Sequence, residues 1–463
     1  MPDLTWRGGT EIAASVASGA LTARAVVDAA LDRIAARDGV LNAFTDVTAA
    51  RARARAAAID AERAAGRPVG PLAGVPFAVK NLFDVAGLPT RAGSAINRAR
   101  PPAVHDAVLV TRLEQAGAVL VGALNMGEYA YDFTGENRHD GPSRNPHDTS
   151  RMTGGSSGGS GAAVAGGLVP LSLGSDTNGS IRVPASLCGL FGLKPTFGRL
   201  PRTGSFPFVS SLDHLGPLAR TVGDLACAYD AMQGHDAEDP CCAQRLENPV
   251  SAALESGIAG LRIAQAGGYF RANLMPEAER AVRLVSDALH AEPVVELPEA
   301  ARARAAAYLI TTAEGAALHL ARLRERAAAF DPDVRDRLIA GAMVPAAMLI
   351  QAQKFRRWYQ RAVSRLFDGV DAIIAPATPC CAPALGQKSF VLDGVELPVR
   401  ANLGLFTQPI SFIGLPVVAV PVAGPMPIGV QIIAPPWRED IALRIARYLE
   451  VSGTAVAQRP AEG

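Results

Sequence analysis

Two serines stand in glycine-rich stretches of the chain, and their surroundings could support attack on a carbonyl group. Ser156 lies in the tract 154–161, and Ser180 lies further along in the segment 176–182. Glycine in regular structure costs conformational entropy, but it lets main-chain N–H groups approach another molecule closely. Its clustering around these two hydroxyl groups indicates a site where the backbone meets a substrate.

A serine hydroxyl becomes a nucleophile only when a nearby group removes its proton, and that group is usually a histidine. None of the 7 histidines stands in a local pattern that identifies it as a base. His214 has no evident proton-transfer partner, and we expect it in the core. Lys80 is the alternative, because a lysine at the end of a buried strand can lose its charge by desolvation and then accept a proton. A lone lysine at a strand end is more often a surface residue, so this prediction depends on the two serines.

The glycine tract also fits a second pattern. G-x-S-x-G occurs at Ser156 and at Ser157, which is compatible with an α/β-hydrolase that has its nucleophile there. That interpretation leaves Ser180 without a role, and it needs an acid and a histidine downstream that no local pattern identifies. A phosphate-binding loop is a weaker interpretation, because the tract contains neither G-x-x-x-x-G-K-[ST] nor G-x-G-x-x-G.

Length and composition indicate a globular protein with a small-molecule partner. The 463 residues include 45 Lys and Arg against 44 Asp and Glu, with no long run of one sign, so nothing marks a nucleic-acid surface or a binder of acidic lipid. The 6 cysteines have no spacing that fits a zinc site, and scattered thiols favour a reducing compartment. The N-terminus lacks a signal-peptide pattern, and no apolar run approaches about 20 residues. We expect a soluble, cytoplasmic protein without metal or cofactor that binds neither nucleic acid nor membrane.

The elements around the serines alternate between helix and strand, which is typical of an α/β protein. Alternating apolar residues at 75–79 predict a strand that ends on the lysine, and a helix at 106–116 leads into a buried strand at 119–121. A further strand at 168–173 places Ser180 in the loop that follows it. Short β-branched runs predict late strands at 373–374, 417–422 and 430–433, before a last helix that begins at Asp440.

The whole chain, 1–463, is expected to form one domain, because no linker or repeat separates independent units. Its parts are an N-terminal helical segment at 1–70, a core with the motifs at 71–235, a mainly helical insertion at 240–365, and a return to strands with a C-terminal helix at 370–463. Within the core, residues 158–167 are small enough for a helix packed very close to its neighbours. Ser156 would lie at the N-terminus of that helix.

Three motifs together resemble the amidase signature family. They are the segment 74–81 with Lys80, the tract 154–160 with Ser156 and the segment 176–185 with Ser180, in the family's order and separation. The resemblance extends over nearly the whole chain. It implies a mixed central β-sheet covered by helices on both faces, with a helical insertion, and an enzyme that cleaves a C–N amide bond.

The resemblance also implies a role for each of the three polar residues. Ser180 matches the family's nucleophile, Ser156 matches its bridging serine, which is usually held by a cis peptide bond, and Lys80 matches its base. Ser156 would pass a proton from Ser180 to Lys80 and later return one to the leaving nitrogen. Amide cleavage needs that return, because an unprotonated amine anion is a very poor leaving group.

In this family the oxyanion hole is formed by main-chain N–H groups next to the nucleophile, which here belong to Thr177, Asn178, Gly179 and Ser180. Asn178 stands where many relatives have glycine, and its side chain is expected to project towards the substrate as a specificity element. We expect Asp176 and Arg182 to brace this loop by charge-assisted hydrogen bonds.

The expected substrate is a small anionic amide. Arg337 aligns with an arginine that holds the substrate carboxylate in the glutamine-hydrolysing components of tRNA-dependent amidotransferases, and a guanidinium can grip both carboxylate oxygens. Tyr131 is expected to line the same pocket. Those components place an aspartate for the substrate ammonium where this chain reaches about Gly404, which argues against an amino-acid substrate. The tracts 405–409 and from 330 onward are most similar to a subgroup that releases ammonia from the terminal amide of a carboxylated, urea-like molecule and leaves a dicarboxylated urea.

Other functions remain open at this point. They are the glutamine-hydrolysing component of a tRNA-dependent amidotransferase, a general small-amide amidase, and a scaffold without activity. A scaffold should have lost one of Lys80, Ser156 and Ser180, and the chain keeps all three. Related enzymes associate with a small helical protein, so the resemblance implies a groove for such a companion. The expected assembly is a homodimer or a heterotetramer.

Overall fold

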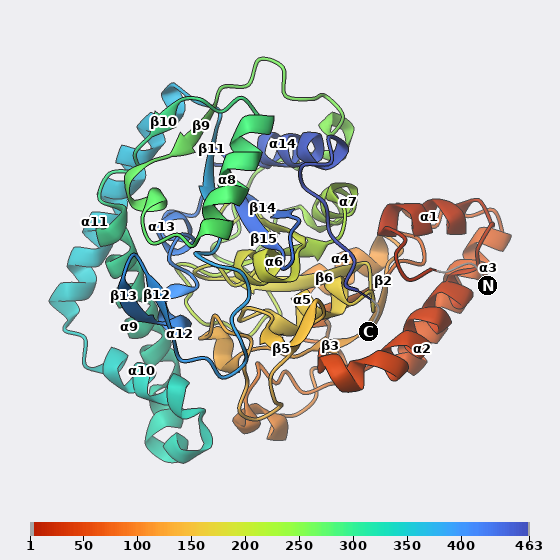
Figure 1. Ribbon diagram of the computed structural model, residues 1–463. Helices are drawn as coiled ribbons and strands as arrows, with labels where there is room; N and C mark the ends of the chain where they lie inside the picture. Colours follow the sequence, from red (N-terminus) through yellow and green to blue (C-terminus); the bar gives the residue numbers. More distant parts are fainter. Residues whose placement is uncertain (1–3, 462–463) are drawn as a thin grey trace.

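The computed structural model describes residues 4–461. Its centre is a mixed sheet of 11 strands (Figure 1). These strands are β1 Phe44–Val47, β2 Pro76–Lys80, β3 Val119–Leu124, β6 Leu171–Asp176, β7 Phe191–Lys194, β8 His214–Ala219, β9 Ile263–Ala266, β10 Val294–Val295, β11 Ala372–Pro376, β14 Val417–Val422 and β15 Ile428–Ile433. They lie in the order β1-β3-β2-β6-β8-β7-β14-β15-β11-β9-β10. Two small ribbons lie outside this sheet, formed by β4 Arg144–Asn145 with β5 Asp148–Met152 and by β12 Ser389–Leu392 with β13 Val395–Pro398.

Helices cover both faces of the sheet, with an N-terminal group at the right of Figure 1 and a second group at the left. They are α1 Gly9–Ala17, α2 Ala23–Leu41, α3 Ala49–Ala64, α4 Val108–Gln115, α5 Gly158–Ala165, α6 Arg182–Cys188, α7 Val222–Met232, α8 Pro276–Ala288, α9 Ala300–Arg326, α10 Pro332–Ala342, α11 Ala346–Ser364, α12 Val399–Asn402, α13 Gln408–Ser411 and α14 Glu439–Val451. The arrangement confirms the predicted α/β fold class.

The sheet brings the motif residues to one edge. β2 runs parallel to β6, with Phe77 opposite Leu171 and Val79 opposite Leu173. Because parallel strands end at the same edge of a sheet, the carboxyl end of β2 with Lys80 and the carboxyl end of β6 with Asp176 lie side by side. Both strands are buried along their whole length, as expected for parallel strands that are covered on both faces.

The helix predicted at 158–167 is α5, and all eight of its residues are buried. Its small side chains allow a close approach to the loop after β3. A Cβ added at Gly159 would lie 2.5 Å from the main-chain oxygen of Asn125. This packing places the residues just before α5, including Ser156, against the ends of the central strands.

Three segments differ from the predictions. The strand predicted at 168–173 begins only after Pro170, whose nitrogen cannot donate to the ladder, and continues to Asp176. The mainly helical part at 240–365 contains β9 and β10, which complete one end of the sheet beside β11. The helical segment at 1–70 contains β1, which forms the other end. These three strands have two to four residues, too few to produce a periodic signal against helical surroundings.

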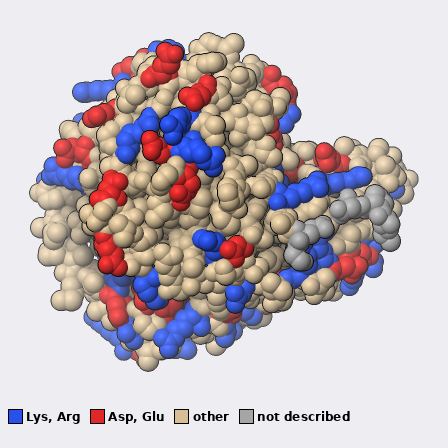
Figure 2. Space-filling view, in the orientation of Figure 1, with Lys and Arg blue, Asp and Glu red and all other residues tan. Residues whose placement is uncertain are grey.

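Positive and negative side chains lie next to one another over the face drawn in Figure 2. Within residues 4–461, no single helix has the length and apolar character to cross a bilayer. Judged by length and composition alone, one bent pair, Pro332–Ala342 with Ala346–Asp368, would pass that test, and its two parts meet at 96°.

Candidate active site

Lys80 is fully buried, and its amine is surrounded by hydroxyl groups. Nζ lies 2.7 Å from Oγ of Ser156, 3.1 Å from Oγ of Ser157 and 2.9 Å from Oγ of Ser175. Burial lowers the pKa of Lys80 to about 7, although the negative charges of nearby aspartates oppose this change. A large fraction of the amine is therefore uncharged at neutral pH, and an uncharged amine can accept a proton from a hydroxyl group.

Ser156 lies in a backbone position that only glycine neighbours allow. The Gly155–Ser156 peptide bond is cis, as the family resemblance implies. A Cβ at Gly155 would overlap the carboxylate of Asp132, and Gly154 has a φ of 77°. The glycines of this tract thus hold the Ser156 hydroxyl beside the lysine amine.

The loop that carries Ser180 connects β6 to α6 and is tied at both ends by one buried ion pair. Oδ1 and Oδ2 of Asp176 accept hydrogen bonds of 2.9 Å from Nη2 and Nε of Arg182, and both side chains are fully buried. Burial opposes ionisation of Asp176, but the charge and hydrogen bonds of Arg182 prevail and hold the pKa of that carboxyl well below its ordinary value. The main-chain N–H of Ile181 also donates to Asp176, at 3.2 Å.

The turn of this loop depends on Gly179. Its φ is 141°, and a Cβ there would overlap Oγ1 of Thr407. The same Thr407 hydroxyl donates a 2.6 Å hydrogen bond to the main-chain oxygen of Asn178. Within residues 4–461, the main-chain N–H groups of Asn178, Gly179 and Ser180 donate no hydrogen bond. They are therefore available to an oxygen atom of a ligand.

Ser180 lines a cavity of about 330 Å³ that also contains the three predicted substrate-binding residues, Tyr131, Asn178 and Arg337. The loop after η2 (Glu128–Ala130) supplies Tyr131, and α10 supplies Arg337. The Arg337 guanidinium stacks on the Tyr131 ring, with Cζ 3.9 Å from the ring centroid. Arg337 is thus part of the cavity wall rather than a solvated helix residue.

Two arginines line this cavity, and they differ in their partners. Arg400 forms ion pairs with Asp132 at 2.6 Å and with Asp333 at 3.3 Å. The Arg337 guanidinium donates to the main-chain oxygens of Asp333, at 2.7 Å, and of Tyr131. Within residues 4–461, no carboxylate forms an ion pair with Arg337. Its charge therefore remains available to an anionic ligand, whereas that of Arg400 is compensated.

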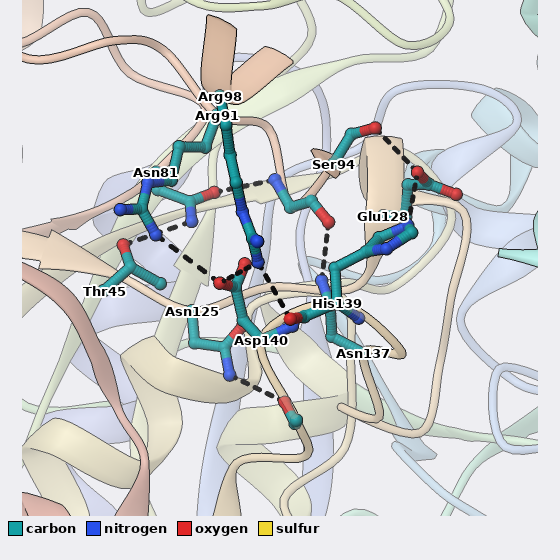
Figure 3. A network of polar contacts seen from close by, with 12 residues as sticks. Thr45, Asn81, Arg91, Ser94, Arg98, Asn125, Glu128, Asn137, His139 and Asp140 are labelled. Carbon is teal, nitrogen blue, oxygen red and sulfur yellow. Dashed lines mark hydrogen bonds and ion pairs between the residues drawn. The ribbon is translucent and has the colours of Figure 1, made fainter. Parts of the chain in front are cut away.

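A buried polar network holds the loops that deliver these residues (Figure 3). Glu128 accepts hydrogen bonds from the Ser94 hydroxyl and from the main-chain N–H of Asp331, both at 2.7 Å, and lies 2.9 Å from Nε2 of His139. Asn137 donates from Nδ2 to the main-chain oxygens of Gly93 and Met126. Because Asp331 caps α10, Glu128 links the loop that carries Tyr131 to the helix that carries Arg337.

Sequence patterns missed several residues of this site. Ser175 escaped notice because the predicted strand ended at 173, whereas β6 continues to Asp176. Arg400 lies far from the motifs in the chain, and no local signal marked it, because only tertiary packing brings it to the cavity. Thr407 lies in the tract 405–409, which is similar to a subgroup of the family, but nothing in the sequence indicated its contact with the loop. His214 is buried as expected, with Nδ1 2.6 Å from the main-chain oxygen of Leu212, and burial holds the pKa of His214 well below its ordinary value.

Within residues 4–461, no group of three or more His, Cys, Asp and Glu side chains is arranged to hold a metal ion. The arrangement at the sheet edge instead provides an uncharged amine on a serine hydroxyl, a second serine in a cavity, and free main-chain N–H groups beside it. These are the parts that acyl transfer to a serine requires.

The fold and this site define an amide-cleaving hydrolase, and the chain belongs to the amidase family, whose model matches residues 25–443. AtzE of Pseudomonas sp. (strain ADP), which is part of a 1-carboxybiuret hydrolase, is 56% identical over 449 residues, which cover 96% of this chain and 98% of that protein. The GatA-type component of the glutamyl-tRNA(Gln) amidotransferase of Chromohalobacter salexigens is 38% identical over 485 residues, with 98% of each chain covered.

A solved structure of similar fold comes from a vestigial protein complex that reveals the evolutionary origins of an s-triazine catabolic enzyme. It has a TM-score of 0.97 and 56% sequence identity, and the match covers 98% of this chain and 100% of that chain. The expected family, fold class and type of enzyme are therefore confirmed.

Proposed function

We propose that this protein hydrolyses the terminal amide of 1-carboxybiuret, releasing ammonia and urea-1,3-dicarboxylate. The observation that carries the chemistry is the buried amine of Lys80, 2.7 Å from the Ser156 hydroxyl, with its pKa lowered by burial to about 7. The substrate is inferred from the 56% identity to a component of a 1-carboxybiuret hydrolase. The uncompensated guanidinium of Arg337 in the cavity supports a carboxylated substrate.

In the proposed reaction, Ser180 attacks the terminal carbonyl carbon. Its proton passes to Ser156, whose own proton passes to Lys80, and the free N–H groups of the loop stabilise the oxyanion. The lysine proton then returns through Ser156 to the leaving nitrogen, so that ammonia departs and an acyl-enzyme remains. A water molecule, activated by the same groups, hydrolyses the acyl-enzyme and regenerates Ser180.

We assign the substrate carboxylate to Arg337, whose stacking on Tyr131 fixes the plane of the guanidinium. A planar guanidinium binds a carboxylate through two parallel hydrogen bonds, which gives direction as well as affinity. Asn178 and Tyr131 are assigned to the urea-like part of the substrate, because both line the cavity that Ser180 faces.

Glutamine hydrolysis in a tRNA-dependent amidotransferase is the second candidate, since the component of such an enzyme from Chromohalobacter salexigens is 38% identical. The packing at Gly404 argues against it. A Cβ at Gly404 would overlap the ring of Phe133, so a side chain able to bind the substrate ammonium has no room there. We infer that amino acids are poor substrates.

We further infer that the protein associates, either as a homodimer or as a heterotetramer with a small helical companion. A 56% identical relative was solved as part of a protein complex, which supports association. The six cysteines are all unpaired, which supports a reducing compartment such as the cytoplasm.

A screen of ammonia release tests the proposal. Purified protein is offered 1-carboxybiuret, biuret, glutamine, asparagine and a simple aryl amide, and initial rates are compared. We expect the highest kcat/KM for 1-carboxybiuret. A preference for glutamine would favour the amidotransferase function, and a preference for the aryl amide would favour a general amidase.

A further inference from the structure

Helix α9 holds two carboxamide side chains of the cavity in defined orientations. Nδ2 of Asn178 donates a 2.8 Å hydrogen bond to Oγ1 of Thr311. Nε of Arg304 donates a 2.9 Å hydrogen bond to Oε1 of Gln408. Thr311 and Arg304 lie seven positions apart on α9, so they occupy the same face two turns apart.

The contact to Arg304 leaves only one orientation of the Gln408 amide. Arginine carries donors and no acceptor, so only the Gln408 oxygen can face it. The guanidinium is itself held, because Nη2 also donates to the main-chain oxygen of Ala401 and to Oδ1 of Asn402, both at 2.8 Å. Within residues 4–461, Nε2 of Gln408 makes no hydrogen bond and remains a free donor.

The Asn178 amide is held through its nitrogen, whereas the Gln408 amide is held through its oxygen. With its nitrogen on Thr311, its oxygen Oδ1 is buried and has no hydrogen-bond partner within the described part of the chain. Asn178 as a whole is only 6% exposed. A buried acceptor without a partner costs free energy, which a bound N–H donor would recover.

The two residues that carry these atoms line one cavity. Asn178, Gln408 and Ser180 all line it, and Thr407, the neighbour of Gln408, contacts the main chain of Asn178 through a 2.6 Å hydrogen bond. One free acceptor and one free donor next to the serine complement a ligand that carries an N–H and a carbonyl oxygen.

We propose that Asn178 and Gln408 recognise an –NH–C(=O)– unit of the substrate, with Oδ1 of Asn178 accepting the N–H and Nε2 of Gln408 donating to a carbonyl oxygen. Thr311 and Arg304 are positioning residues that set the two amides. The inference rests on the proposed amide hydrolysis and narrows its substrate class to ureido compounds. An amide with carbon in place of that nitrogen leaves Asn178 unsatisfied.

Two stable compounds test the contribution of the N–H group that Asn178 is proposed to bind. N-carbamoyl-β-alanine and glutaramate share a carboxylate, a terminal carboxamide and the same chain length, and they differ by replacement of one NH with CH₂. Their affinities are measured by titration calorimetry on the Ser180→Ala background, so that turnover does not interfere. We expect at least about tenfold tighter binding of the ureido compound, because a site with a buried hydrogen-bonding group discriminates against an analogue that lacks the partner.

The matched variants are Thr311→Val, which removes the anchoring hydroxyl at nearly constant shape, and Thr311→Ser, which keeps it. Thr311→Val should bring the affinity ratio close to one, whereas Thr311→Ser should preserve it. A merely structural role of Thr311 would weaken both probes equally and leave the ratio unchanged. Equal affinity of the Ser180→Ala protein for the two probes, or no binding of either, would overturn the proposal. An affinity ratio that Thr311→Val leaves unchanged would also overturn it.

A second variant tests the donor. Gln408→Glu keeps an oxygen for Arg304 but replaces Nε2 with an acceptor that repels a carbonyl oxygen, so both probes should bind at least about tenfold more weakly. Unchanged affinities would show that Gln408 does not contact the bound probes. Ammonia release from 1-carboxybiuret by the parent protein is recorded in parallel. If no ammonia is released, the proposed function is refuted. If ammonia is released but the two probes bind with nearly equal affinity, only the proposed preference for ureido compounds is refuted.

Discussion

Lys80 differs from most lysines because its buried amine contacts three hydroxyl groups rather than a carboxylate. Burial lowers the pKa of this amine to about 7, which makes it a usable base at neutral pH. The same burial penalises the folded state whenever the amine is protonated. Activity and stability are therefore coupled through the protonation of one side chain.

This coupling predicts a pH dependence of the free energy of unfolding. Between pH 7 and pH 10 the folded Lys80 is largely neutral, whereas the unfolded lysine still binds a proton, so stability due to this residue rises with pH. Relative to Lys80→Met, the parent protein should gain on the order of 4 kcal/mol over this range. Denaturant unfolding at several pH values measures the difference. Parallel curves for the two proteins would show that the lysine has an ordinary pKa.

A second prediction concerns Arg337, whose charge has no carboxylate partner in the cavity wall. Arg337→Met should raise KM for 1-carboxybiuret at least about tenfold and change KM for uncharged biuret little. Arg335→Met is the matched control, because Arg335 lies on the same helix but does not line the cavity. Its ion-pair partner at 2.7 Å is Asp336. If both substrates respond equally to Arg337→Met, the carboxylate is bound elsewhere.

Among the elements, the loop between β6 and α6 shows most clearly how local structure serves the chemistry. The ion pair of Asp176 and Arg182 joins its two ends, and the Thr407 hydroxyl supports its middle. The loop can then keep its N–H groups free, because these contacts replace the hydrogen bonds that its own backbone does not make.

Gly179→Ala should disturb this loop without unfolding the protein. The new methyl group would overlap Thr407 in a backbone conformation that only glycine adopts readily, and displacement of the N–H donors should lower kcat by about 100-fold or more. Gly386→Ala is the control, since Gly386 has a φ of 76° and open space around it. Activity close to that of the parent protein in Gly179→Ala would contradict the role of the loop.

How far sequence alone predicts these elements depends on their length and packing. Clear periodic or compositional signals came from the strand that ends on Lys80, the strand before the Ser180 loop, helix α5 and the late strands at 417–422 and 430–433. Strand β9, which lies between β11 and β10, has only four residues beside long helices, and its pairing with β11 depends on contacts distant in the chain. The same distinction between local signals and distant contacts applies to the residues of the site. The triad stands in recognisable motifs, whereas Thr311 has no local signal. Gln408 lies in the tract 405–409, which is similar to a subgroup of the family, but only its contact with Arg304 on α9 sets its orientation.

In the whole molecule, the cavity combines residues from the loop between β6 and α6, from the loop after η2 and from helices α9 and α10. Glu128 connects the loop after η2 to α10, because it accepts a hydrogen bond from the main-chain N–H of Asp331. Helices α9 and α10 therefore do more than cover the sheet, because they supply residues that line the cavity.

The proposed association is a property of the whole molecule and can be measured directly. Sedimentation of the purified protein should give a mass above the 48.1 kDa of one chain. Addition of a small helical partner should then shift the mass again. A mass of one chain at every concentration tested would contradict the proposed homodimer, and no further shift with the partner would contradict the heterotetramer.

The most direct test of the account is the pH dependence of kcat/KM for ammonia release from 1-carboxybiuret between pH 5.5 and pH 8.5, roughly spanning the lowered pKa of Lys80. We predict a rise of about tenfold per pH unit on the acid side, with a plateau above the midpoint near 7, because only the uncharged amine can accept the relayed proton. A flat profile over this range, with the protein folded throughout, would contradict a lysine base.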